Sequence, residues 1–138
     1  TIATFTTVTT DRLIVAAGGA TFASMIGMTS YVNAYAASIT IAGLRGGHQE
    51  IVLTGAVNFL APSDYDLESS FELFVTQGGA GSYAIAFASG AGGFLFPVGL
   101  SGTALATSVG DCDYYRFKHR GAPASHWLCT SHLKYTPP

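Results

Sequence analysis

Apolar and polar residues alternate along most of the chain after residue 36, and this period of two predicts β-strands. Residues 38–42 read Ser-Ile-Thr-Ile-Ala, and residues 113–118 alternate polar or charged side chains with aromatic ones. Glycine or proline closes most of these runs, as expected for residues that interrupt strand pairing. The pattern predicts at least eight short strands, over residues 38–42, 50–54, 57–60, 71–76, 82–87, 94–98, 113–118 and 125–135.

One pair of runs predicts a hairpin. The runs at residues 71–76 and 82–87 flank Gly78-Gly79-Ala80-Gly81. Glycine supplies the positive φ that tight turns require, so we expect the two runs to pair directly.

The C-terminal runs predict a second antiparallel pair. We expect residues 125–135 to pair with residues 113–118, with the connection near residues 121–123. Pro97 places the run at 94–98 at a sheet edge or a strand end, because proline has no amide hydrogen for the ladder.

The first 36 residues are less regular. Residues 20–37 are the only helix candidate, and Gly27, the β-branched residues and the missing caps argue against a regular helix. We expect this segment to be an arm that adds strands to the fold or wraps over a neighbouring subunit.

A membrane span is the alternative for this part of the chain. No charged residue occurs from Leu13 to Leu44, a stretch long enough for a transmembrane helix. Small and polar residues interrupt it, and only Arg12 flanks it as an anchor. Residues 1–5 also lack the basic start of a secretory signal. We therefore expect no membrane span.

Together these patterns predict an all-β protein, a β-sandwich or jelly roll with an irregular N-terminal arm over residues 1–36. The 138 residues form a single domain in this interpretation, because no linker, repeat or low-complexity tract divides them.

The composition indicates a surface that other subunits cover. The chain is 49% hydrophobic and only 10% charged, against about 25% charged residues in ordinary soluble domains. Its net charge of −2 gives no electrostatic reason to expect nucleic acid as a partner. Arg116, Lys118 and Arg120 form the one basic cluster, and their spacing of two predicts a solvated strand face.

Two acidic groups are candidates for chemistry. Asp64, Asp66 and Glu68 follow Pro62 and have the oxygen ligands that calcium prefers, but a polar turn is the simpler interpretation. Asp111 and Asp113 have the spacing of paired carboxylates for acid–base catalysis. They flank the start of a predicted strand, where solvated acids are common, and we expect nothing else to converge on them.

His126, Cys129 and His132 are the candidate metal ligands. Side chains alternate between the faces of a strand, so His126 and His132 are expected on one face and Cys129 on the other. One strand therefore does not gather all three around a zinc ion. Cys112 and Cys129 are either free thiols or one bridge between neighbouring strands, and free thiols are favoured.

The aromatic residues Trp127, Tyr114 and Tyr115 are expected in the core, with a sugar-stacking platform as the alternative. The chain contains no Gly-x-Ser-x-Gly elbow and no phosphate-binding loop. We therefore expect no enzyme activity, no catalytic residues, no metal and no cofactor.

Several motifs in residues 51–135 resemble, in order and spacing, a β-sandwich module of tailed-phage fibres and related virion proteins. They are Val-Leu-Thr-Gly-Ala-Val-Asn-Phe at 52–59, Phe-Glu-Leu-Phe-Val-Thr-Gln-Gly-Gly-Ala-Gly-Ser-Tyr at 71–83, Phe96-Pro97, Asp-Tyr-Tyr-Arg-Phe at 113–117 and Trp127. The resemblance implies a glycine-rich hairpin, an aromatic–proline strand and a final hairpin that closes on the tryptophan. It implies no catalytic residues.

The resemblance leaves two functions open. A complete protein of this size, without a fibre shaft, is expected to be a capsid decoration or cement protein on the capsid exterior. Its partners are then the major capsid protein and copies of itself, in a homodimer or homotrimer, with no nucleic acid and no membrane. A fragment is instead expected to be a trimeric fibre tip that binds a host surface glycan. A glycan-processing enzyme is the least favoured alternative, because no convergent acid pair is evident.

Overall fold

The computed structural model describes residues 30–42, 47–63, 69–121 and 125–138. These residues contain strands and no helix, so the prediction of an all-β chain is confirmed for this part. Every predicted run overlaps a strand, and β1 was not predicted. The strands are β1 (Tyr31–Val32), β2 (Ser38–Thr40), β3 (His48–Leu53), β4 (Val57–Leu60), β5 (Ser70–Gln77), β6 (Ile85–Phe87), β7 (Phe94–Leu95), β8 (Cys112–Arg120) and β9 (His126–Tyr135).

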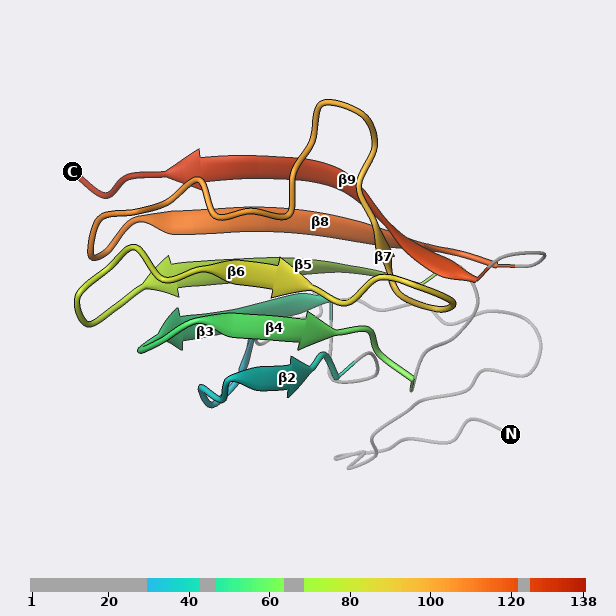
Figure 1. Ribbon diagram of the computed structural model, residues 1–138, viewed down its shortest axis with the longest axis horizontal. Coiled ribbons are helices and arrows are strands. Elements are labelled where there is room, and N and C mark those ends of the chain that lie inside the picture. The colour runs from blue at the N-terminus through green and yellow to red at the C-terminus, as the bar shows by residue number, and fades with distance from the viewer. Residues whose placement is uncertain (1–29, 43–46, 64–68, 122–124) are drawn as a thin grey trace, which may run out of the picture.

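The strands form two sheets (Figure 1). The larger has the order β1-β3-β5-β8-β9-β7, and the smaller has the order β2-β4-β6. From β1 to β6 the chain alternates between the sheets, so each strand returns to its own sheet beside the strand before last. These neighbours are parallel, in the manner of successive coils of a solenoid.

The predicted hairpin between residues 71–76 and 82–87 is wrong. β5 and β6 lie in different sheets, and the glycine-rich segment carries the chain from one sheet to the other. Gly79 and Gly81 have φ of 52° and 71°, so the need for glycine was interpreted correctly. The turn was predicted correctly and the pairing was not, because a tight turn does not determine which strand the following strand pairs with.

The second predicted pairing is confirmed. β8 and β9 are antiparallel, and β8 also pairs antiparallel with β5. The predicted connection includes Gly121, while residues 122–124 lie outside the described part of the chain. β7, which precedes Pro97, is an edge strand as predicted.

Side chains from both sheets meet in one hydrophobic core. Phe87 of β6 is partly buried and packs against this core, with its ring centroid about 5 Å from those of Phe59, Phe94 and Tyr115. Burial of each large apolar side chain contributes about 1.5–3 kcal/mol, so this core is the main source of stability. The fully or nearly fully buried members include Ile41, Ile51, Leu53, Phe59, Leu73, Val75, Tyr115, Phe117 and Trp127.

Most of the expected arm lies outside the described residues, which begin at residue 30. Its last part contributes β1, which pairs in parallel with β3 at the edge of the larger sheet. Residues 30–37 are not helical. Among the described residues there is no helix with the length and hydropathy needed to span a bilayer.

Candidate functional site

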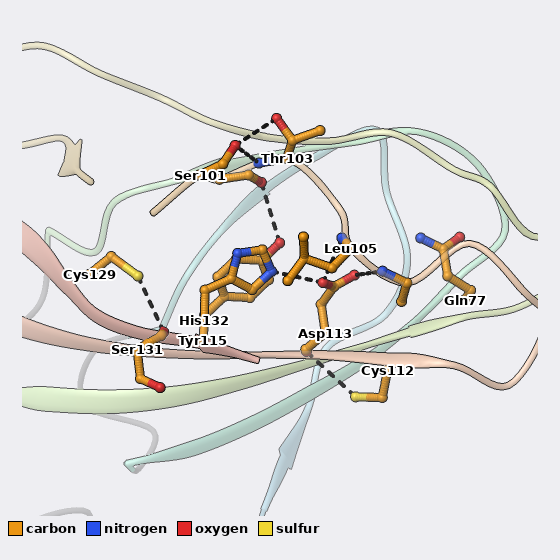
Figure 2. A network of polar contacts seen from close by, with 12 residues as sticks. Gln77, Ser101, Thr103, Leu105, Cys112, Asp113, Tyr115, Cys129, Ser131 and His132 are labelled. Atoms are coloured by element: carbon orange, nitrogen blue, oxygen red, sulfur yellow. Dashed lines mark hydrogen bonds and ion pairs between the residues drawn. The ribbon is translucent and has the colours of Figure 1, made fainter. Parts of the chain in front are cut away.

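Asp113 and His132 form the centre of a buried polar network on the core side of β8 and β9 (Figure 2). The Nε2–H of His132 donates a hydrogen bond of 2.8 Å to Asp113 Oδ1, and the two side chains are 2% and 0% exposed. The backbone N–H groups of Leu105 and Ala106 donate to the two carboxylate oxygens over 2.9 and 3.1 Å. Asp113 therefore holds residues 96–111, which we call the β7–β8 connection, against the core.

Tyr115 extends this network. Its ring stacks on His132 with centroids 4.1 Å apart, and its hydroxyl donates to the carbonyl oxygen of Gly102 at 3.3 Å. Burial raises the pKa of Tyr115 well above its ordinary value, so the hydroxyl remains a donor at every physiological pH. All three side chains are enclosed, so the network organises the β7–β8 connection and offers no reactive group to a substrate.

The expectation that Asp111 and Asp113 are solvated acids on which nothing converges is wrong. Both are buried. Lys134 Nζ lies 2.6 Å from Asp111 Oδ2, and this hydrogen bond lowers the pKa of the Asp111 carboxyl. Because each acid has its own partner, Lys134 or His132, they are two structural carboxylates and do not form a dyad that shares a proton. The expectation failed because the alternation of residues along one strand does not reveal that the β7–β8 connection folds back over these acids.

The argument that Cys129 and His132 point to opposite faces is also wrong. Arg116 pairs with Ser131 and Phe117 pairs with Cys129, so one extra residue, Thr130, interrupts the ladder as a β-bulge. The bulge reverses the alternation, and Cys129 and His132 are both buried.

His126 does not join them, since it lies at the start of β9 and is only partly buried. In the described ranges there is no group of three or more His, Cys, Asp or Glu side chains that could hold a metal ion. Asp64, Asp66 and Glu68 lie outside those ranges, so the calcium interpretation stays untested.

The two cysteines are free thiols, as favoured. Cys112 lies on the outward side of β8, whereas Cys129 is in the core. Burial raises the pKa of Cys129 to about 11 and raises that of Cys112 as well. Neither thiol is therefore activated as a nucleophile at neutral pH.

The aromatic and basic predictions hold for most of their residues. Tyr115 and Trp127 are core residues, while Tyr114 is half-buried on the other side of β8. The basic row of Arg116, Lys118 and Arg120 is exposed on one strand face.

The outward side of β1, β3, β5, β8 and β9, which we call the outer face, carries an apolar patch. Phe74 and Tyr114 lie at its centre, with ring centroids 4.9 Å apart. Exposed apolar side chains surround them, an arrangement typical of interaction sites. Their exposed fractions are 66% for Val32, 56% for Val52, 48% for Leu133 and 51% for Tyr135.

A polar cluster borders this patch. The His48 ring stacks on Phe74 at 4.6 Å, and its Nε2 lies 3.0 Å from Glu50. The Tyr114 hydroxyl donates to Glu72 Oε1 at 2.9 Å. An open depression of 460 Å³ lies beside the cluster, lined by Ser30, Gly47, His48, Ser70, Phe71, Glu72 and Arg116.

The β7–β8 connection carries a second set of exposed apolar residues. Figure 1 shows this segment crossing β8 and β9 on the side that β2, β4 and β6 occupy. Its inward residues, such as Phe96 and Ala106, pack on the core, whereas Val98, Leu105 and Val109 are exposed. These three residues belong to the connection and not to the strands of the outer face.

Sequence reasoning did not identify either apolar surface. The available signal was the presence of large apolar residues at outward positions, such as Val52 in β3 and Leu133 in β9. The sequence matches no model of a known protein family and no curated protein at a significant level.

Proposed function

We propose that the protein is a structural component of a phage virion, and that it acts as a decoration or cement protein on the capsid exterior. The observation that carries this proposal is the presence of exposed apolar residues in two parts of the molecule, the outer face and the β7–β8 connection. A protein that joins neighbouring subunits needs at least two contact surfaces, and this arrangement supplies them.

The low charge of the chain supports the same function. With 10% charged residues, the protein has few groups that keep its surface hydrated, and apolar surface remains available for association. Standard interfaces bury about 1,600 Å² in total. Cementing then works by mass action, because a protein that binds only the assembled shell stabilises that shell.

The proposed architecture is a β-sandwich, whose two sheets share the core described above. Five of the seven pairs of neighbouring strands in the described ranges are parallel, whereas a jelly roll is antiparallel. We therefore favour a sandwich of parallel coils closed by the antiparallel strands β8 and β9.

Binding to shells that lack the protein tests this function. We expect stoichiometric co-sedimentation with empty capsids, and a higher temperature of shell disruption when the protein is bound. The variant Val98→Asp/Val109→Asp places charges on the β7–β8 connection and is expected to weaken shell binding at least tenfold. Ser89→Asp, at an exposed position that belongs neither to the outer face nor to the β7–β8 connection, is the control and should bind like the parent protein.

A second candidate function is a fibre tip that binds a host glycan. It is favoured by the 460 Å³ depression, where Ser30, Ser70, Glu72 and Arg116 present hydroxyl and charged groups of the kind that bind sugars. Trp127 is buried and offers no stacking platform. Binding to host cells without binding to shells would support the fibre tip and contradict the cement proposal.

A further inference from the structure

Strand register arranges the outer face in rows that cross the sheet. Glu72 of β5 lies beside Arg116 of β8, and in the next row Phe74 lies beside Tyr114. The row after that of Phe74 contains Val52 of β3 beside Thr76 of β5. Tyr135 of β9 lies in this same row, beside Cys112.

These rows are complementary to themselves under one symmetry operation. A two-fold axis between β5 and β8, parallel to the strands and just above the outer face, keeps each row in place. It exchanges β5 with β8 and β3 with β9. Glu72 then faces Arg116 of a second copy, Phe74 faces Tyr114, and Val52 faces Tyr135. In these three pairs an acid meets a base and apolar groups meet apolar groups, as an isologous interface requires.

We infer that the outer face binds a second copy of this chain, in a face-to-face dimer about this axis. The inference rests on the proposed function in one respect: the second copy is one of the two partners proposed for the cement protein, and the shell is the other. The β7–β8 connection then remains free for the shell. Glu50 faces Leu133 in this arrangement, and its carboxylate keeps its partner His48 at 3.0 Å.

The size of the face is adequate for a stable dimer. Four neighbouring strands of about eight residues cover a footprint of about 500 Å² at a spacing of ~4.8 Å and a rise of ~3.3 Å per residue. Side-chain relief raises the accessible area above this footprint, toward the ~800 Å² that each partner contributes to a standard interface. Sheets packed in this way lie about 10 Å apart and within about 30° of alignment, so the central rows stay opposed.

Charge reversal tests the pairing of Glu72 with Arg116 directly. The parent protein is expected to have the mass of a dimer in sedimentation equilibrium at micromolar concentration. Glu72→Arg and Arg116→Glu each place like charges opposite one another at two symmetry-related positions. Each variant is therefore expected to weaken the dimer at least tenfold. An equimolar mixture of the two variants is expected to form a heterodimer, because every opposed pair then joins an arginine to a glutamate.

Lys118→Glu is the matched control. It makes the same change of charge on the same strand face as Arg116→Glu, but under the two-fold it lies opposite Ser70. It is expected to dimerise within about threefold of the parent protein. Circular dichroism of each variant checks that the fold is retained, and restored assembly in the mixture is independent evidence that both variants are folded.

Three results would overturn the inference. A trimer of the parent protein excludes a two-fold dimer. A monomer whose outer-face strands are protected from hydrogen exchange means that the face is covered within the chain. A monomer that binds shells and loses this binding on Val52→Glu means that the shell occupies the face. In the last case the cement function survives, whereas a dimer that fails to bind shells contradicts the cement function and leaves the dimer intact.

Discussion

Asp113 shows how much organisation a single buried side chain provides at the residue scale. Its carboxylate accepts hydrogen bonds from two backbone N–H groups and from His132, and it is fully buried. Hydrogen bonds to a charged group contribute about 1.5–3 kcal/mol each, more than those between neutral groups. A buried carboxylate without these partners is strongly unfavourable, so Asp113 and the β7–β8 connection are expected to become ordered together.

Replacement of Asp113 by Asn is expected to lower the free energy of unfolding by about 1–3 kcal/mol, the range for leaving one buried donor without a partner. Asn has one acceptor oxygen where Asp has two, because an NH₂ group donates and does not accept. The backbone N–H of either Leu105 or Ala106 therefore loses its partner. Urea unfolding followed by tryptophan fluorescence measures the change through Trp127. Thr103→Ala, an exposed position in the same connection, is the control and should change stability by less than about 1 kcal/mol. An equally stable Asp113→Asn variant would refute the role of the carboxylate.

At the scale of single elements, residue pattern predicted strand positions well and strand partners less well. The runs at 57–60 and 71–76 became β4 and β5 because alternation depends only on which face each side chain buries. Whether β6 pairs with β5 or crosses to the other sheet depends on contacts with β4, distant in sequence, so Gly78–Gly81 do not reveal it. The bulge at Thr130 was unpredictable for a related reason, because the ladder partner in β8 determines it. That one residue also determined whether Cys129 and His132 share a face.

Removing Thr130 tests the bulge as an element. Its deletion brings Cys129 and His132 two positions apart, opposite Phe117 and Tyr115, so both remain on the core face of a regular ladder. We expect the deletion variant to keep a cooperative thermal unfolding transition. Thr130→Ala keeps the backbone and removes only the exposed 3.2 Å hydrogen bond from Oγ1 to the Arg116 carbonyl oxygen. It is expected to lower stability by less than about 1 kcal/mol. A deletion variant without a cooperative transition would contradict the assignment of Thr130 as the extra residue.

On the scale of the whole molecule, the larger sheet separates two surfaces with different proposed partners. Its outer face combines the apolar patch with charged rows, and its other side supports the β7–β8 connection. Composition indicated a covered surface but could not locate it, because the outward positions are identified only once strand register is known. Burial and ion pairing also shift the pKa of titratable groups in the fold, so folding is expected to respond to pH.

Two groups predict the response of folding to acid. Burial lowers the pKa of His119 below its ordinary 6.5, and the bond to Lys134 lowers that of Asp111 below 3.8. Both groups are more easily protonated in the unfolded chain, so each stabilises the fold above its unfolded pKa and loses this contribution as pH falls through its folded pKa. Urea midpoints are expected to decrease first below about pH 6.5 and again below about pH 4. His119→Gln should remove the upper decrease, and Asp111→Asn should reduce the lower one. A midpoint that rises on acidification between pH 6.5 and 5 would show that His119 is protonated more readily in the folded protein.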